Sequence, residues 1–347
     1  MNPTPLHDAL AAAGARFGQF GGVETAATFG DLAKEYAALR SGAAVYDLGR
    51  RAKILLTGND RVRWLNGMVT NNVRDLAPGH GNYNFLLNAQ GHILADLYVY
   101  NRGDYLLVDT GQEQAARVLE LFDKFIIMDE VETTDASERL TAIGVAGPKA
   151  AEVLQKVGLA VPAEPLSVHD LEWEQIGLSV VRQDGRDDYE LWLAAQNAAT
   201  AWNALVVAGA MPAGYEALEL ARIADGIPRF GVDIREKELP QETAQQRALN
   251  FNKGCYLGQE IVERIHARGA VHRELKGFEV THGLPAAGAK ISAGGKEVGQ
   301  VTSVAQLPNG SRRTLALGYI RREAGTPGTE VEIEGAKARV SSLPFKD

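Results

Sequence analysis

The octapeptide KGCYLGQE, residues Lys253–Glu260, contains the only cysteine of a 347-residue chain. Gly254 and Gly258 flank this cysteine, and glycine permits backbone conformations and close approaches that other residues resist. A cysteine used as a small core hydrophobe is expected to have apolar neighbours on its own side of a helix or strand. The pattern around Cys255 instead predicts a loop that presents a thiol, which as a thiolate is a nucleophile and a metal ligand.

A helix is predicted after the cysteine, because apolar residues recur at helical spacing from Gln259 to Ala267. Cys255 would then lie near the N-terminus of this helix, where the helix amides and Lys253 both favour a thiolate. His266 and His272 are close in sequence and could supply a base. Unpaired cysteines are also among the most buried residues, so the local chemistry leaves a purely structural role open.

Two carboxylates are predicted to lie on strands. Asp96 follows the turn of a predicted hairpin, and Glu190 stands in the β-rich run DDYELWL. A strand carboxylate with apolar neighbours needs a hydrogen-bond donor. A heteroaromatic ring with N–H groups would provide that donor and could stack on Tyr83 or Phe85. Pairing with nearby arginines, or solvation, is the alternative.

The composition restricts the chemistry further. A single cysteine excludes an intrachain disulfide and any all-cysteine zinc or iron–sulfur site built from one chain, and we predict no metal ligands. The signatures G-x-x-x-x-G-K-[ST], G-x-G-x-x-G, H-E-x-x-H and G-x-S-x-G do not occur in the sequence. The net charge of −8 argues against nonspecific binding to nucleic acid.

Charge is distributed unevenly along the chain. From Arg247 to Asp347 there are 15 Lys and Arg residues against 10 Asp and Glu residues, a net charge of +5, although the whole chain carries −8. This end could therefore face an anionic ligand or partner, or it could be a solvated basic surface.

We expect a cytoplasmic protein. The N-terminal stretch MNPTPLHDALAAAGARFG includes Asp8 and lacks the basic region that precedes the apolar run of a secretory signal. No apolar stretch in the sequence approaches the ~20 residues needed to span a bilayer.

Two segments share a strand–turn–helix pattern and predict two α+β modules of related design. KILLTGNDRVRWLNGM has its turn at Gly58-Asn59-Asp60, and TAIGVAGPKAAEVLQKVG has its turn at Gly147-Pro148. Asn or Asp at a helix start and Pro in the first turn are known start signals. A hairpin around Asn88–Gly91 and an amphipathic helix in QEQAARVLELFDKFI follow the first segment.

The remaining patterns divide into more α+β elements and a β-rich end. LSVHDLEWEQIGLSVVRQDGRDDYELWLA predicts three strands, and AATAWNALVVAGA and YEALELARIADG predict two helices. From about Leu275 onward, short β-rich runs alternate with glycine turns, which predicts a small antiparallel barrel. The cysteine motif lies between the α+β body and this barrel, and ligand sites favour such junctions.

Together these residues resemble the folate-binding YgfZ family, relatives of the glycine-cleavage T-protein, which is an aminomethyltransferase. The resemblance covers nearly the full length and is carried by GNDRVRWLNGMVTNNV, NAQGHILADLYVY, RIADGIPRFGVDI, LPQET, FNKGCYLGQEIVERIHARG and ALGYIR. The cysteine octapeptide with the following Arg268-Gly269 is its most specific part.

The resemblance implies an α+β fold of the aminomethyltransferase type. It implies a three-domain ring of two ferredoxin-like α+β domains and a C-terminal antiparallel β-barrel, around a channel for tetrahydrofolate. A discontinuous folate-binding domain would comprise residues 1–50 with 136–245, and a second α+β domain residues 51–135. Residues 246–274 would form a linker with the cysteine motif, and residues 275–347 the barrel.

The resemblance also implies roles for single residues. Cys255 stands where the transferase has an acid, and it is a catalytic candidate together with Lys253. Asp96 is the acid that remains of a tandem pair, because Ala95 stands in the other position. The predicted folate contacts are Tyr83, Asp96, Glu190 and Arg222, and the other motif residues are Gly254, Tyr256, Gly258, Gln259, Glu260 and Arg268.

The function that the resemblance implies is that of a tetrahydrofolate-binding accessory protein for the assembly or repair of iron–sulfur clusters, using one reactive thiol. Its partners would be client enzymes, including enzymes that modify tRNA, or assembly factors. It would contact neither nucleic acid nor membrane directly and would be a monomer or weak dimer. A folate-dependent aminomethyl or one-carbon transferase of the T-protein type is the alternative, and a non-catalytic folate-binding module is a second one.

Overall fold

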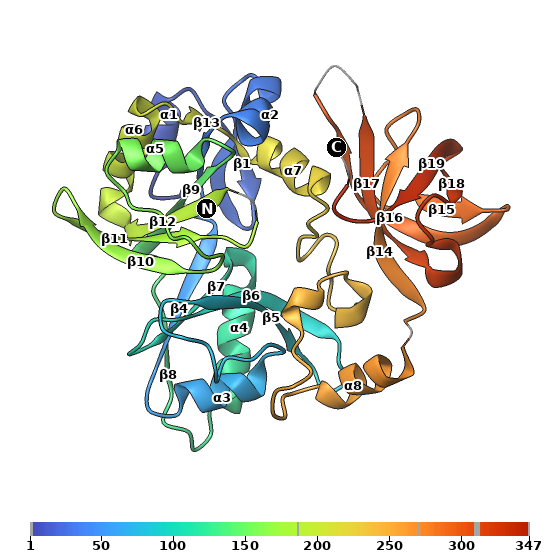
Figure 1. Ribbon diagram of the computed structural model, residues 1–347, viewed down its shortest axis with the longest axis horizontal. Coiled ribbons are helices and arrows are strands. Elements are labelled where there is room, and N and C mark those ends of the chain that lie inside the picture. Colours follow the sequence, from blue (N-terminus) through green and yellow to red (C-terminus); the bar gives the residue numbers. More distant parts are fainter. Residues whose placement is uncertain (1–2, 186, 270, 309–312, 346–347) are drawn as a thin grey trace. The chain divides into compact units, whose positions relative to one another are not determined.

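The computed structural model describes residues 3–185, 187–269, 271–308 and 313–345 (Figure 1). The chain divides into two compact units, which are described separately. Unit 1 comprises Met1–Asn66, Asn72–Tyr83 and Leu97–Leu218, and unit 2 comprises Gly67–Asn71, Asn84–Asp96 and Glu219–Asp347.

A six-stranded sheet forms the first layer of unit 1, with the strand order β10-β11-β12-β9-β3-β13. Neighbouring strands pair antiparallel, except that β13 runs parallel to β3. The strands are β3 (Ala44–Asp47), β9 (Leu140–Ala146), β10 (Val168–Trp173), β11 (Ile176–Arg182), β12 (Asp188–Ala194) and β13 (Met211–Pro212).

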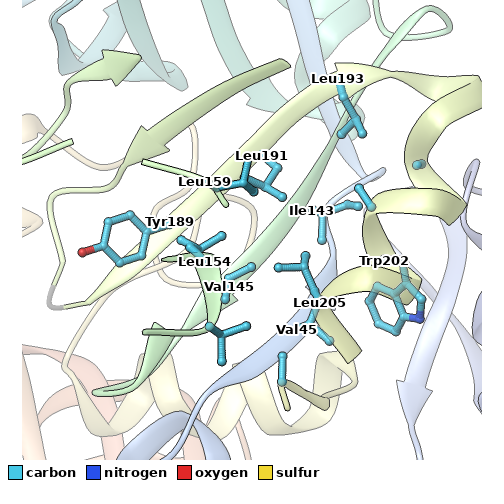
Figure 2. Packing of buried hydrophobic residues seen from close by; sticks show 14 of the residues in the cluster. Val45, Ile143, Val145, Leu154, Leu159, Tyr189, Leu191, Leu193, Trp202 and Leu205 are labelled. Atoms are coloured by element: carbon cyan, nitrogen blue, oxygen red, sulfur yellow. The ribbon is translucent and has the colours of Figure 1, made fainter. Parts of the chain in front are cut away.

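Helices cover one face of this sheet and form the larger hydrophobic core of unit 1. They are α1 (His7–Ala12), α5 (Ala150–Lys156) and α6 (Ala198–Val207). Figure 2 shows how Val45 and Val145 from the sheet meet Leu154 of α5 and Trp202 of α6. The predicted turn before α5 is confirmed, because the helix starts directly behind Gly147-Pro148.

A second sheet has the strand order β5-β6-β7-β4-β8. Its strands are β4 (Arg51–Thr57), β5 (Gly81–Leu87), β6 (Ile93–Asn101), β7 (Leu106–Gly111) and β8 (Glu132–Asp135). Within unit 1, Tyr100 and Leu107 from this sheet pack with Tyr46 and Trp192 from the other, so the two sheets share a buried layer. The strands predicted on both sides of the Asn88–Gly91 turn are confirmed.

Two predicted helices flank the second sheet. They are α3 (Arg61–Met68) and α4 (Gln112–Phe125). The predicted amphipathic helix is confirmed as α4. Its apolar residues Val118 and Phe122 are fully buried, as the pattern predicts. The ring of Trp64 on α3 meets the ring of Phe122 edge-on, with 5.2 Å between the ring centroids.

Several elements of the structure were not predicted by the sequence patterns. They are helices α1 and α2 (Leu32–Ser41), the hairpin of β1 (Arg16–Phe20) and β2 (Val23–Thr28), and strands β3, β8 and β13. At the start of α2, Asp31 accepts a hydrogen bond of 3.1 Å from the backbone N–H of Lys34, which is an N-cap. The predicted helix near Tyr215 is confirmed as α7 (Tyr215–Ala224).

Unit 2 contains a closed six-stranded antiparallel barrel with the order β14-β17-β16-β15-β18-β19. Its strands are β14 (Arg273–Val280), β15 (Lys290–Ala293), β16 (Lys296–Gln306), β17 (Thr314–Arg321), β18 (Glu330–Ile333) and β19 (Ala336–Ser341). Phe278, Ile291, Ile320 and Ile333 fill its interior. The predicted α+β fold class with a C-terminal antiparallel barrel is therefore confirmed.

The segment before the barrel holds α8 (Gln259–Arg268) and two short 3-10 turns, η2 (Pro240–Glu242) and η3 (Gln246–Ala248). Helix α8 is amphipathic and buries Val262, and it ends at Gly269, which has a φ of 71°. The predicted helix after the cysteine is thus confirmed. Across the described ranges, no helix is both long and apolar enough to cross a membrane.

Candidate functional site

The side chain of Lys253 anchors the start of the cysteine motif within unit 2. Its Nζ donates hydrogen bonds of 2.6 Å to the backbone oxygens of Val69 and Asn71. The same ammonium group lies 5.0 Å from the centroid of the Tyr256 ring, which is a favourable cation–π distance. Only 7% of Lys253 is exposed, and burial lowers the pKa of its side chain to about 7.

Gly258 anchors the other end of the motif. Its φ of 81° is left-handed, and a Cβ added there would lie 2.4 Å from the backbone oxygen of Asn88. The neighbouring backbone N–H of Leu257 donates a 3.1 Å hydrogen bond to the oxygen of Gly67. Glycine at position 258 therefore lets the motif pack directly on the turn between β5 and β6.

Cys255 lies between these two anchors and is exposed. Tyr256 is buried beside it, and the Tyr256 backbone N–H donates a 3.2 Å hydrogen bond to Oε1 of Gln259 in the first turn of α8. Gly254 differs from Gly258, because a Cβ added there would contact nothing within 4 Å. The thiol thus lies on a short exposed bend whose two ends are fixed.

The remaining residues of the motif lie on α8 or beyond it. Glu260 in the first turn and Arg268 in the last turn are both exposed. The candidate bases are exposed as well, and the ring of His266 stacks on Phe251 with 3.8 Å between the centroids. A role for His266 or His272 as a base stays a prediction.

A buried charge cluster surrounds Glu190 in unit 1. Nζ of Lys53 on β4 lies 3.1 Å from Oδ2 of Asp109 and 3.9 Å from Oε2 of Glu190. Nε of Arg51 lies 2.9 Å from the other oxygen of Asp109. Lys53 and Asp109 are direct partners across the β4–β7 pairing, which explains why the chain can bury both.

The two carboxylates of this cluster differ in their ionisation. Burial raises the pKa of Glu190, and the charge of Asp109 adds to this effect while Lys53 opposes it. Burial acts on Asp109 as well, but Arg51 and Lys53 outweigh it and hold the pKa of Asp109 below its ordinary value. Glu190 is therefore the carboxyl of the pair whose charge state is easier to change.

An aromatic run leads to Glu190. The ring centroids lie 4.9 Å apart for Tyr83 and Tyr98, 6.4 Å for Tyr98 and Tyr100, and 4.8 Å for Tyr100 and Trp192. Nε1 of Trp192 donates a 2.7 Å hydrogen bond to Oε2 of Glu190. Unit 1 therefore combines aromatic rings with a buried carboxylate acceptor, and 7% of Glu190 stays exposed.

The two other predicted folate contacts lie in unit 2. Asp96 is half-buried on β6, a few residues beyond the turn on which the cysteine motif packs. Arg222 on α7 donates hydrogen bonds of 2.8 Å to Asp233 and 2.9 Å to Ser303, and it pairs with Glu219. These bonds tie α7 to the barrel strand β16, which gives Arg222 a structural role that the sequence did not predict.

Within unit 2, the structure brings the cysteine motif and the hairpin of Asp96 into contact, while Tyr83 and Glu190 belong to unit 1. Phe85 is fully buried, so it offers no face for stacking. Lys53 and Asp109 were not among the predicted residues. The signal was present, because both are charged residues inside apolar strand patterns, the same criterion that selected Asp96 and Glu190.

The Lys253 anchor makes the stability of the protein dependent on pH. The pKa of Lys253 is about 7 in the folded chain against an ordinary value of 10.5, so the unfolded chain binds more protons between these values. We expect the free energy of unfolding to rise with pH in this window, by at most about 1.4 kcal/mol per pH unit. Urea denaturation of wild type and Lys253→Met at pH 6 to 9 measures this, and parallel profiles would contradict it.

Comparison with known proteins places the chain in a family. Residues 6–253 match the GCVT N-terminal domain, and residues 273–347 match the glycine cleavage T-protein C-terminal barrel domain. The chain is 30% identical over 355 residues to an aminomethyltransferase of Thermus thermophilus, with 99% of both chains covered. An aminomethyltransferase of Geobacillus kaustophilus is 29% identical over 363 residues, covering 99% of this chain and 98% of that one.

A solved structure gives the same result for the fold. The glycine cleavage system aminomethyltransferase T from Bartonella henselae superposes with a TM-score of 0.90 at 24% identity, covering 99% of this chain and 98% of that chain. The two proteins therefore share the aminomethyltransferase fold. The chain belongs to the glycine cleavage T-protein (GCVT) family.

Proposed function

We propose that this chain binds tetrahydrofolate and transfers a one-carbon unit, as an aminomethyltransferase of the T-protein type. The observation that carries the proposal is the family match, which extends over both the N-terminal domain and the C-terminal barrel. Curated relatives that match over 99% of the chain are named aminomethyltransferases.

The residues around Glu190 have the chemistry that a reduced pterin requires. A pterin ring presents N–H donors along one edge and a flat face, and the aromatic run from Tyr83 to Trp192 ends at a carboxylate. Lys53 and Trp192 hold that carboxylate, so it is ordered before any ligand arrives. When bound, tetrahydrofolate supplies the nitrogen atoms that accept the one-carbon unit.

Each predicted folate contact then has a task. Glu190 accepts hydrogen bonds from the pterin N–H groups. Tyr83, 5% of which is exposed whereas Phe85 is fully buried, contributes an aromatic contact. Asp96 provides the carboxylate that the transfer of an aminomethyl group needs near the folate. Arg222 positions α7, and its direct contact with folate is part of the proposal.

The transfer reaction is tested by measuring methylenetetrahydrofolate formed from an aminomethyl donor. We expect turnover by the wild type and a loss of about 100-fold or more in Asp96→Asn, in the range typical for a general acid or base. Asp104→Asn is the control, because Asp104 is an exposed loop aspartate. Absence of turnover by the wild type rejects the transferase proposal.

Folate binding is tested separately by calorimetric titration with tetrahydrofolate. We expect Glu190→Gln to weaken binding about 10- to 100-fold, because a hydrogen bond to a charged group contributes about 1.5–3 kcal/mol. Glu172→Gln on β10 is the control, since Glu172 is exposed on the same sheet. A wild type that binds no tetrahydrofolate would overturn both the transferase proposal and the second candidate function, which also requires folate binding.

A second candidate function is favoured by Cys255. The only thiol of the chain is exposed on a bend with two fixed ends, and aminomethyl transfer has no need of it. We propose as this second function the YgfZ-type role, in which the protein supports the assembly or repair of iron–sulfur clusters in client enzymes, including tRNA-modifying ones. One cysteine cannot hold a stable cluster, so any contact is transient or shared with a client.

Complementation separates the two candidates. In cells that lack the protein, Cys255→Ser is expected to abolish the restored activity of cluster enzymes, while its folding and tetrahydrofolate binding stay at wild-type values. Asp96→Asn in the same cells is the matched variant, and it should complement if the thiol alone is needed. Full complementation by Cys255→Ser removes the thiol from the function. Folate binding without an effect of either variant would indicate a non-catalytic folate module.

A further inference from the structure

A pocket of about 490 Å³ lies on the outer wall of the barrel within unit 2. The segment around Arg235 and Lys237 forms one side, and strands β14, β16 and β17 form the other. Arg273, Arg321, Tyr319 and Gln300 are its principal lining residues from the barrel. None of these residues has a task in either proposed function.

The lining of this pocket is basic. Four cationic side chains border it, and the carboxylate that borders it, Glu297, is bound to Lys290 at 2.7 Å. Arg273 is partly neutralised from behind, because its guanidinium lies 3.1 Å from Glu242 and 3.6 Å from Glu238.

The other three cations lack such partners. Arg235, Lys237 and Arg321 form no ion pair within the part of the chain that the structure describes. Arg235 and Lys237 act on the fully buried Glu238 only at longer range. The pocket therefore carries uncompensated positive charge.

The pairing of β14 with β17 adds an energetic argument. Arg273 and Arg321 stand directly opposite each other in this register, on the outer face of the barrel. Like charges directly opposite on antiparallel strands are destabilising. An anion between the two guanidinium groups would turn this repulsion into attraction.

Two buried polar atoms at the pocket also lack a partner. Nε of Arg235 and Oη of Tyr319 have no hydrogen-bond partner among the described residues. Tyr319 is 4% exposed, and the guanidinium of Arg273 lies 4.8 Å from its ring centroid. Burying a polar group without a hydrogen-bond partner is unfavourable.

We propose that this pocket is a binding site for a small organic anion with at least two carboxylate or phosphate groups. Guanidinium groups bind carboxylate and phosphate oxygens in a bidentate manner. Arg235 and Lys237 reach the ligand from one side, and Arg321 and Arg273 reach it from the barrel. The site is independent of the proposed function, since it shares no residue with the predicted folate contacts or the cysteine motif.

Calorimetric titration with citrate and with pyrophosphate tests the site on the full chain. We expect one equivalent to bind the wild type with a Kd below 1 mM, and the double variant Arg235→Gln/Arg321→Gln to bind at least 10-fold more weakly. Lys337→Gln/Arg339→Gln on β19 is the matched control, because it removes the same charge from another part of the barrel surface. Tighter binding of citrate identifies a polycarboxylate ligand, and tighter binding of pyrophosphate identifies a phosphorylated one.

Two outcomes of the titration overturn the proposal. Either the wild type binds neither anion up to 10 mM, or the double variant binds them as tightly as the wild type does. A thermal unfolding scan of Arg321→Gln without anion gives a second measurement, and we expect an unchanged or raised Tm because the cross-strand repulsion is removed. A lowered Tm would mean that Arg321 stabilises the barrel itself, which also contradicts the site.

Discussion

Replacing Asp109 by alanine is expected to lower the free energy of unfolding by about 3–5 kcal/mol, because it leaves a buried cation without its partner. Lys53 is fully buried and lies 3.1 Å from Asp109, and Arg51 lies 2.9 Å from the same carboxylate. Glu190 at 3.9 Å from Lys53 compensates only part of the loss. Urea denaturation at pH 7 measures the effect.

The double variant Lys53→Met/Asp109→Leu is the matched control for this prediction. It removes both charges and keeps side chains of similar length, so we expect it to be more stable than the single variant. A single variant that loses less than about 1 kcal/mol would contradict the assignment, because that is the range of an exposed pair. In the double variant, the pKa of Glu190 should be higher than in the single variant, because the charge of Lys53 no longer lowers it.

Gly258→Ala is expected to destabilise the protein by about 3 kcal/mol or more, and the loss has two sources. An alanine with a left-handed φ costs about 1–2 kcal/mol. Its Cβ would also lie 2.4 Å from the oxygen of Asn88, so the motif must move off the turn of the β5–β6 hairpin.

Two other glycines separate these two sources. Gly269 has a similar φ of 71° with nothing within 4 Å of an added Cβ, so Gly269→Ala should lose only the cost of the backbone conformation. An added Cβ at Gly254 also meets nothing, so Gly254→Ala should be nearly neutral. Equal losses for Gly258→Ala and Gly269→Ala in urea denaturation would show that the close approach to Asn88 is unimportant. The rate at which a thiol reagent labels Cys255, the only cysteine of the chain, shows in each variant whether the motif has moved.

Local patterns predicted the elements whose signal lies within one segment. The helix expected over Gln259–Ala267 is observed as α8, Gln259–Arg268, and the barrel strands lie where glycine turns separate β-rich runs. Strand β13 could not be predicted, because its two residues become a strand only by pairing with β3. The domain boundaries proposed from the resemblance stay a prediction.

For the candidate site, the sequence identified residue types better than it identified their contacts. Glu190 was expected to pair with arginine, solvent or a ligand, whereas it accepts a hydrogen bond from Trp192 and lies near Lys53. The partner Asp109 is 56 positions beyond Lys53 and meets it only through strand register. Lys253 was expected to stabilise a thiolate at Cys255, but its Nζ is bound by two backbone oxygens, so its influence on the thiol stays a prediction.

The acceptors that hold Lys253 are main-chain atoms, and every amino acid carries a main-chain oxygen. The side chain at position 69 can therefore exchange among apolar residues without loosening the lysine, whereas the lysine itself has no substitute of the same reach and donor geometry. In homologues that keep this bend, evolutionary drift at position 69 should be tolerated while position 253 is retained. An alignment of such homologues should show an invariant column at position 253 and a variable column at position 69.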